Sequence, residues 1–526
     1  MDDTSGARLI GRLGQRWQHL ETGFHSAYWD AATHATPENE ARSAELELGL
    51  RRAKGDPVAL RQVDAELEAG GRDRLLRRQL EVVRHSLLGN QMEDDIRSEV
   101  VALSSSIASD FASHRPRLGG AEVSDNDIQE VLERSDDVAE RRLAWGASKE
   151  IGAVVAERVR RLAELRNLAA RAAGFSDYYS MSLALQELPE EGLWARLDHL
   201  ERLTRKPFTA WKENLDDVLS RRFGAGELEP WHYADPFFQS LPPDGAVTLD
   251  EHFPGATAPL LAERTFRRWG IDLSGVMARS DLWPRPGKSQ HAFCIQMDRK
   301  EDVRILGNVV PGQRWAEVML HESGHAAYDA CIDPSLPYLL RRPAHTFVTE
   351  GTAIMSGRLV RDPRWLVDIA GIRPSLIAQV EEDLERMTSA ASLLFARWGL
   401  VMVHFERALY EDPASDLDGL WWDLVERFQL VRRPRERRAP DWAAKVHIAT
   451  APVYYQNYLL GEMLATQLRA AIERDLDANL VEAPAAGRWL EERFWTTGAS
   501  LRWDELITAS TGRELSPEDF AADLAR

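Results

Sequence analysis

The residues best suited to chemistry lie in the segment AEVMLHESGHAAYDA, where two histidines stand four positions apart. On a helix, His321 and His325 would lie on one face about one turn from each other, so both imidazoles could reach one tetrahedral zinc ion. Glu322 follows the first histidine and could accept a proton from a water on the open side of the metal, because zinc lowers the pKa of that water. The HExxH pattern therefore predicts the zinc site of a hydrolase.

Such a site needs a third protein ligand, and a glutamate downstream is the best candidate. The segment RRPAHTFVTEGTAIMSGRLV begins a second helical pattern, and it places Glu350 at a distance of 25 positions from His325. Two histidines and one glutamate form a ligand set known for catalytic zinc. His345 is the competing ligand, but Glu350 lies within the helix proper. We therefore expect one zinc ion per chain on His321, His325 and Glu350.

A second cluster of polar and aromatic residues occurs in AAKVHIATAPVYYQNYLLGEML. Hydrolysis of a peptide bond needs a donor aimed at the oxyanion that forms on the attacked carbonyl, and tyrosine or histidine can supply it. Tyr455 and Tyr458 are three positions apart and share a helix face. The candidate residues of this cluster are Lys445, His447, Tyr454, Tyr455 and Tyr458.

The elements that must position these residues are mostly helices. From residue 9 to about 214, apolar residues return every three or four positions, which predicts helix packed on helix. Residues 223–290 are rich in Pro, Gly and aromatics and favour ordered loops and short helices. HAFCIQMD and VRILGNVV alternate apolar and polar residues around the turn RKED, which predicts a hairpin. Helical periodicity resumes after Pro311 and Gly312.

The composition restricts the partners of the protein. The 84 acidic and 65 basic residues give a formal charge of −19, which disfavours nucleic acid and anionic membranes. The two cysteines, Cys294 and Cys331, suit a reducing compartment. The N-terminus has no continuous apolar segment of the kind that a signal peptide or membrane span requires. We therefore expect a cytoplasmic protein without nucleic-acid or membrane partners; the oligomeric state is not predicted.

Taken together, these motifs resemble the angiotensin-converting enzyme family of dipeptidyl carboxypeptidases, in a shorter, bacterial-looking form. The shared features are HESGH, a glutamate about 25 residues on, and KxH followed by YxxY. His291 and Ala292, 30 positions before His321, resemble the family's HA pair on an edge strand. Three further segments extend the likeness over nearly the full length: LAWGASKEIG, LRNLAARAAGFSDYYS and AYWDAATHATPE.

The resemblance implies a role for each matching residue. Zinc would bind His321, His325 and Glu350, Glu322 would act as general base and then acid, and Tyr458 would stabilise the oxyanion.

It also implies a substrate site. Lys445 and Tyr455 would hold the terminal carboxylate of a peptide, and His447 and His291 would bind its carbonyls. The main chain of Ala292 would pair with the peptide as an added strand. Tyr454 is grouped with these substrate-binding residues. A lysine and a phenol that converge on one carboxylate would explain why a free C-terminus is required.

The chain departs from the family pattern at several positions. Ile354 stands where the family has an aspartate that orients a zinc-bound histidine, so another partner must serve. Asn457 replaces the family's chloride-linked arginine, which argues against chloride activation. One extra residue separates His447 from Tyr455. The family's usual disulfides are absent.

The family fold is a largely helical ellipsoid with a deep central channel, a zinc-binding HExxH helix and a small hairpin beside the active site, and the helical periodicity agrees with a mainly α fold. We expect one peptidase unit over 1–526, in which 1–222 form a helical lid or bundle and 223–526 form the catalytic region. Within that region we expect the hairpin at 291–310, the zinc helices at 313–361 and the Tyr/His cluster at 445–458.

The expected activity is hydrolysis of short peptides with a free C-terminus by a zinc metallopeptidase that releases dipeptides. One alternative is an oligoendopeptidase resembling the thimet oligopeptidase group, and another is a metallocarboxypeptidase that removes single residues. A third is a catalytically silent peptide-binding homologue, or a tailoring enzyme of small-molecule biosynthesis that has kept the zinc site.

Overall fold

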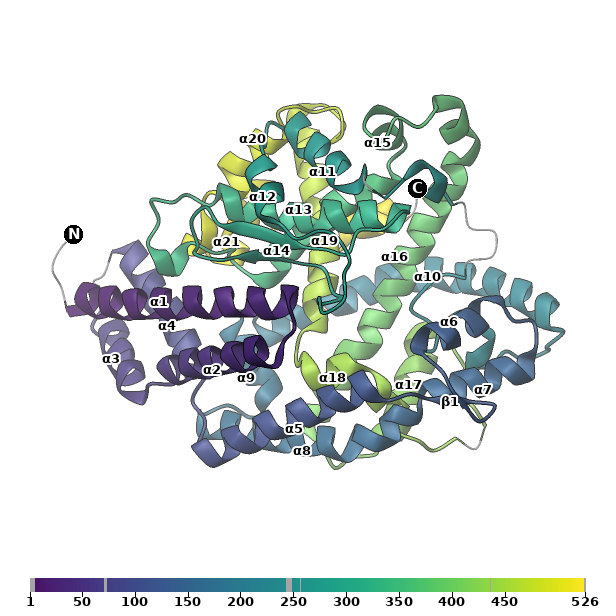
Figure 1. Cartoon of the computed structure of the whole chain (residues 1–526), viewed down its shortest axis with the longest axis horizontal. Helices are drawn as coiled ribbons and strands as arrows, with labels where there is room; N and C mark the ends of the chain where they lie inside the picture. Colours follow the sequence, from purple (N-terminus) through teal and green to yellow (C-terminus); the bar gives the residue numbers. More distant parts are fainter. Residues whose placement is uncertain (1–4, 71–72, 243–247, 256, 436, 525–526) are drawn as a thin grey trace. The chain divides into compact units, whose positions relative to one another are not determined.

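The computed structural model of the chain describes residues 5–70, 73–242, 248–255, 257–435 and 437–524. Most of these residues lie in helices, and the strands among them form two short antiparallel pairs (Figure 1). The mainly helical fold with a small hairpin is therefore confirmed.

The chain forms two compact units, each assembled from segments that are distant in sequence. Unit 1 comprises Met1–Gln91, Val247–Glu382 and Leu460–Phe520, and unit 2 comprises Met92–Ala246, Asp383–Leu459 and Ala521–Arg526. Three helices contain residues of both units: α16 (Pro374–Glu411), α19 (Tyr455–Leu476) and α22 (Glu518–Asp523). The single peptidase unit and the lid role of 1–222 stay predictions.

Unit 1 carries the predicted zinc helices and the hairpin. Its other elements are α1 (Ser5–Thr33), α2 (Pro37–Lys54), α3 (Pro57–Glu68), α4 (Arg74–Leu88), η2 (Asp250–His252), α11 (Thr257–Arg268), α12 (Ser274–Arg279), η3 (Tyr338–Leu340), α15 (Pro363–Asp368), α20 (Ala486–Leu490), η6 (Glu491–Trp495), η7 (Gly498–Ser500) and α21 (Trp503–Thr511).

The N-terminal helices of unit 1 share one hydrophobic core. On α1, Leu9, Leu13 and Trp17 recur at helical spacing and are buried against Leu80 and Leu87 of α4. A single apolar stripe of this kind is what a helix needs to pack on its neighbours. The stripe explains why the first helices fold onto each other.

The predicted hairpin forms from β3 (Phe293–Gln296) and β4 (Val303–Leu306) in antiparallel register, with Phe293 opposite Leu306. The end of α1 covers it, because Trp29 packs with Leu306 and Met297 in a separate apolar cluster. A second, shorter hairpin, β1 (Arg117–Leu118) and β2 (Ala121–Glu122), interrupts the region in which helical periodicity predicts helices alone. Its turn is Gly119–Gly120, and both glycines adopt the positive φ that tight hairpin turns require.

Unit 2 contains α5 (Asp94–Ser113), α6 (Asp125–Arg134), α7 (Val138–Ser148), α8 (Glu150–Ala172), α9 (Tyr178–Leu185), α10 (Glu190–Phe223), η1 (Pro230–His232), α17 (Leu417–Gln429), η5 (Asp441–Ala444) and α18 (Val446–Thr450). The aromatic loop of unit 2, residues 231–240, is anchored by a buried arginine. The buried guanidinium of Arg141 donates hydrogen bonds to the carbonyls of Trp231, His232 and Tyr233. Such bonds to a buried loop satisfy backbone acceptors that water cannot reach.

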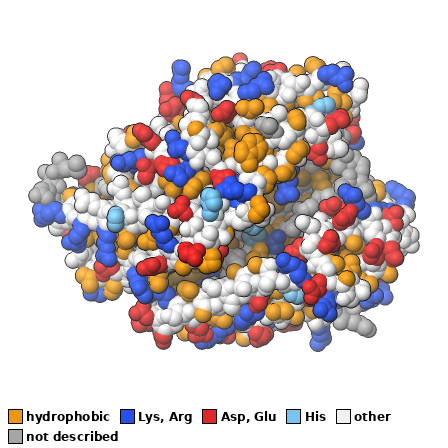
Figure 2. Space-filling model, in the orientation of Figure 1, with side chains coloured by type: hydrophobic (Ala, Val, Ile, Leu, Met, Phe, Trp, Pro, Cys, Tyr) orange, Lys and Arg blue, Asp and Glu red, His pale blue; other side chains and the backbone are white. Residues whose placement is uncertain are grey.

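The face of the molecule seen in Figure 2 carries acidic and basic side chains in alternation, and its basic side chains are not gathered into one continuous patch. In the part of the chain that the structure describes, every helix is too short or too polar to cross a bilayer.

Candidate metal centre

Two adjacent helices bring the three predicted ligands together. α13 (Gln313–Cys331) carries His321 and His325, and α14 (Thr346–Gly357) carries Glu350. The Nε2 atoms of His321 and His325 lie 3.6 and 3.9 Å from Oε2 of Glu350. One donor atom of each residue lies within 4.8 Å of the other two. The helices therefore place two imidazoles and one carboxylate around a common point.

These separations suit a zinc ion. Donor atoms about 2.1 Å from a tetrahedral zinc ion lie about 3.4 Å from one another, and the two histidine–glutamate separations, 3.6 and 3.9 Å, are close to this value. Three protein donors leave a fourth position for water or substrate, which distinguishes catalytic from structural sites. The geometry therefore fits the zinc site that the sequence predicts.

The glycine inside HESGH explains how the two helices approach so closely. A Cβ atom at Gly324 would lie 2.8 Å from the Cα of Ala353 on α14, which is closer than real Cβ contacts. A larger residue would therefore push α14 away and carry Glu350 with it. Gly324 therefore helps to position the ligands, besides connecting His321 and His325 in the sequence.

The environment keeps both histidines ready to bind metal. Burial lowers the pKa of His321 to about 4 and lowers the pKa of His325 well below its ordinary value, so both imidazoles are neutral at pH 7. Nδ1 of His325 lies 2.7 Å from the hydroxyl oxygen of Thr349. If Nδ1–H donates to that oxygen, the lone pair of Nε2 points at the metal position.

Glu322 is buried beside the ligands, with 8% of its surface exposed. Burial and repulsion from Glu350 raise its pKa to about 8, while the backbone amide of Cys294 on β3 donates a hydrogen bond that lowers it. A bound dication would favour the carboxylate form. The carboxylate is thus held between the zinc helix and the edge strand, where a general base for an attacking water belongs.

His345, the competing ligand, does not join the group. It is the residue that precedes α14, and its Nδ1 accepts a hydrogen bond from the amide of Phe347 at 3.1 Å. The imidazole therefore caps the helix that carries Glu350.

The families that match the chain agree with this geometry. Residues 276–526, which include the metal centre, match peptidase family M3, and residues 2–202 match the angiotensin-converting enzyme family. The protein is a zinc metallopeptidase. Both families comprise peptidases, so the chain acts on peptides.

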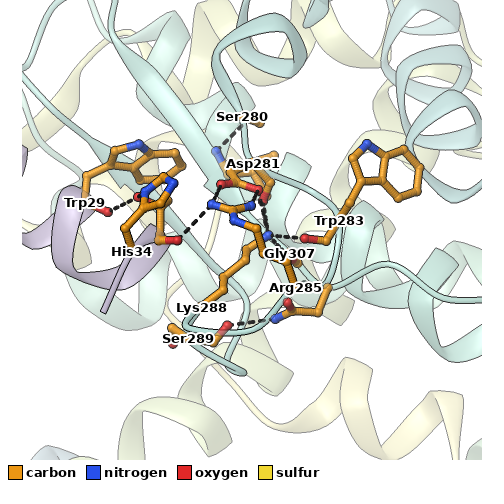
Figure 3. Close-up of polar contacts among 12 residues, drawn as sticks. Trp29, His34, Ser280, Asp281, Trp283, Arg285, Lys288, Ser289 and Gly307 are labelled. Atoms are coloured by element: carbon orange, nitrogen blue, oxygen red, sulfur yellow. Dashed lines mark hydrogen bonds and ion pairs between the residues drawn. The ribbon is translucent and has the colours of Figure 1, made fainter. Parts of the chain in front are cut away.

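In this zinc metallopeptidase, the residues before β3 are fixed by a buried cation. Nζ of Lys288 donates to the carbonyls of Asp281, Trp283 and Gly307 and to the Asp281 carboxylate, at 2.5–3.0 Å (Figure 3). Arg285 binds the same carboxylate and the Thr33 carbonyl at the end of α1. These contacts hold the loop that leads to β3.

His291 and Ala292 follow that loop directly. The His291 side chain is exposed and Ala292 is partly exposed. Among the described residues β3 pairs as a strand with β4 alone, so an added peptide strand would pair on the side away from β4. The role of both residues in substrate binding stays a prediction.

The second cluster belongs to unit 2, and its members do come together. The ring of Tyr455 contacts the rings of His447 and Tyr458 at centroid distances of 5.4 and 5.5 Å, and Tyr454 lies 5.1 Å from Tyr458. Trp398 donates to the Tyr455 hydroxyl at 3.1 Å. The functions predicted for these residues remain predictions.

Two polar residues of these sites were missed in the sequence. Thr349 precedes the ligand Glu350 directly, but a threonine before a glutamate is common and carries no signal of its own. Gln239 accepts a hydrogen bond from Nζ of Lys445 at 2.8 Å. It lies 206 positions earlier, in the aromatic loop, so only the fold reveals the pair.

Proposed function

We propose that this zinc metallopeptidase releases dipeptides from the free C-terminus of short peptides. Lys445 carries the proposal, because its ammonium group is enclosed by neutral groups. It donates to the amide oxygen of Gln239 and lies 5.4 and 5.1 Å from the ring centres of Phe237 and Trp398. Among the described residues, no carboxylate pairs with it directly.

Asp235, the acid that acts electrostatically on Lys445, already accepts hydrogen bonds from backbone amides. The carboxylate of Asp235 accepts hydrogen bonds from the amides of Phe237, Gln239 and Ser240 at 2.8–2.9 Å. Burial lowers the pKa of Lys445 to about 8, and Asp235 opposes this effect. A cation enclosed in this way is stabilised by an incoming carboxylate, and a free peptide C-terminus supplies one.

The remaining residues take the roles that the motifs assign to them. A zinc ion on His321, His325 and Glu350 would polarise the scissile carbonyl and lower the pKa of a coordinated water. Glu322 removes the proton from the attacking water and returns it to the leaving amine. The Tyr458 hydroxyl donates to the developing oxyanion.

Substrate alignment falls to a second set of residues. The main chain of Ala292, directly before β3, pairs with the peptide as an added strand does. His291 and His447 donate to peptide carbonyls. Tyr455 joins Lys445 in holding the terminal carboxylate of the peptide, and Tyr454 belongs to the same set of substrate-binding residues.

Cleavage within a peptide is the second candidate, because the HExxH motif and the downstream tyrosine cluster also resemble the thimet oligopeptidase group. The two modes differ in what they require of the C-terminus. An endopeptidase accepts a continuing chain, whereas Lys445 in the proposed role rejects a neutral terminus because its ammonium group then stays unpaired.

Product masses from three matched peptides test the proposal. The zinc-loaded protein is incubated with one hexapeptide in free, C-terminally amidated and N-terminally acetylated forms. Release of a dipeptide from the free and acetylated forms, with slow cleavage of the amide, supports C-terminal dipeptide release. Equal cleavage of the amidated peptide, or internal products, would favour the endopeptidase instead.

A further inference from the structure

One acidic residue continues the row of metal ligands along α13. Between Met319 and Asp329 every side chain is buried except those of His321, His325 and Asp329. These three residues are spaced by four, and each step of four turns a helix by only about 40°. Asp329 therefore lies on the same side of α13 as the ligand histidines, and all three side chains are partly exposed.

Asp329 also lies beside the edge strand. Asp329 and Glu322 are the two carboxylates that act electrostatically on Cys294 of β3, and α13 packs against that strand. Cys294 is two positions from Ala292, where the peptide is expected to pair. The carboxylate thus borders the track that a bound peptide would follow.

The cation that acts electrostatically on Asp329 already pairs with another carboxylate. Among the described residues this cation is Arg299, whose guanidinium binds Glu21 at 2.8 Å and stacks on the Tyr338 ring. Burial raises the pKa of Asp329 to about 7, and Arg299 opposes this only in part. A carboxylate that is enclosed but still reachable by solvent is stabilised by a cation from outside the chain.

We propose that Asp329 binds a cationic nitrogen of the substrate and so selects peptides with a positive charge near the scissile bond. This inference rests on the proposed function for the direction in which the peptide binds. The nitrogen belongs either to a Lys or Arg side chain or to the free N-terminus.

The charge belongs on the N-terminal side of the scissile bond. In dipeptide release, the C-terminal side ends after two residues in a carboxylate, which Asp329 would repel. Asp329 lies one helical turn, about 6 Å, from His325, and an extended residue spans about 3.3 Å. The cationic group therefore sits about two residues before the scissile bond.

Four peptides that differ only at that position and at the N-terminus separate the two sources of charge. They carry arginine or its neutral isostere citrulline two residues before the scissile bond, each with a free or an acetylated N-terminus. We expect the zinc-loaded enzyme to show a kcat/KM about tenfold or more higher for arginine than for citrulline in the acetylated pair. If the α-ammonium is the ligand instead, the free N-terminus raises kcat/KM in the citrulline pair.

Asp329→Asn tests the residue itself, and the ratio between charged and neutral peptides should fall to near one. Asp333→Asn is the matched control, because Asp333 lies just beyond the end of α13 and its carboxylate accepts a hydrogen bond from the amide of Ser335 at 2.7 Å. This control should keep the ratio of the parent. No charge preference in the parent, or a preference that survives Asp329→Asn, overturns the inference.

Binding measured without cleavage separates this inference from the proposed function. In zinc-loaded Glu322→Gln, the dissociation constants of the four peptides should show the same preference, and adding Asp329→Asn should remove it. If the parent cleaves none of the peptides but the binding preference is present, the proposed function fails and cation recognition stands. Equal dissociation constants overturn cation recognition even if the peptides are cleaved.

Discussion

Nδ1 of His325 and the hydroxyl oxygen of Thr349 lie 2.7 Å apart, which links a metal ligand on α13 to the residue beside a metal ligand on α14. The sequence resemblance implies an aspartate at position 354 for this role, but Ile354 lies near Gly461 of α19, and we propose that Thr349 takes the role instead. A neutral hydroxyl orients the imidazole without adding a second negative charge beside Glu350.

Thr349→Val should therefore weaken zinc binding. Nδ1 of His325 loses its hydrogen-bond acceptor, and the imidazole ring is then no longer held in its orientation. Loss of such an outer partner costs about 10–100-fold in metal affinity. Competition with a chromophoric chelator measures this change. Thr349→Ser keeps the hydroxyl and should retain the affinity of the parent; equal affinity of the valine and serine variants would show that the contact does not orient the ligand.

Glu322→Gln should lower kcat by about 10²–10⁴-fold, because the carboxamide cannot accept the proton of the attacking water. Zinc content should stay at one ion per chain, since the three ligands are unchanged. Glu317→Gln is the matched control on the same helix, where the carboxylate binds Arg361 at 2.8 Å. A Glu322→Gln enzyme as fast as the parent would refute the assigned base.

The sequence was sufficient to predict that His321, His325 and Glu350 come together, because their positions follow from helix geometry. His321 and His325 belong to one helix, and Glu350 belongs to the next helix along the chain. Thr349 was missed because the Nδ1 partner depends on how α14 is rotated against α13, and that rotation is set by the close approach at Gly324. Local spacing carries no information about such a rotation.

Lys445 should make the activity on free C-termini depend on pH. Burial lowers its pKa to about 8, so kcat/KM for a free carboxylate should fall as the pH rises above 8 and the ammonium group loses its proton. The amidated peptide lacks the partner and should show no such decline. Identical profiles for the two peptides would exclude Lys445 as the carboxylate ligand.

Lys445→Met should raise KM for the free peptide by about tenfold to hundredfold, the range expected for a lost charge-assisted hydrogen bond. The amidated peptide should be affected far less. The exposed Lys300 provides a control, because Lys300→Met removes the same charge from the surface of the β3–β4 turn.

A buried network behind the hairpin should control stability at low pH. Glu21 binds Lys54 at 2.7 Å and Arg299 at 2.8 Å, and it accepts a hydrogen bond from Tyr338. Burial alone would raise the pKa of Glu21, but Arg299 and Lys54 lower it to about 2. The stabilisation is therefore present above pH 4.5 and is lost as the pH falls toward 2. It amounts to about 3 kcal/mol.

Denaturant unfolding of the parent and Glu21→Gln at pH 7 and pH 3 tests this network. The glutamine variant should be destabilised by about 3–5 kcal/mol at pH 7, because two buried cations lose their partner. The difference from the parent should shrink at pH 3. A difference that is the same at both pH values would contradict the assigned charge pairing.

The hairpin region shows which features the sequence predicts and which depend on the tertiary fold. Alternation in HAFCIQMD and VRILGNVV was enough to predict β3 and β4, because the period of two is a local property. The loop before them, fixed by Lys288 and Asp281, was not foreseen, because the backbone fold brings four oxygens of Asp281, Trp283 and Gly307 to one ammonium group. The pairing of Lys445 with Gln239 depends on the tertiary fold in the same way.

The central claim is that His321, His325 and Glu350 hold one zinc ion, and anomalous diffraction at the zinc absorption edge tests it most directly. The account predicts one peak per chain, about 2.0–2.2 Å from Nε2 of both histidines and from an oxygen of Glu350. A zinc peak at another place, or a fully loaded protein with no peak between α13 and α14, would contradict it.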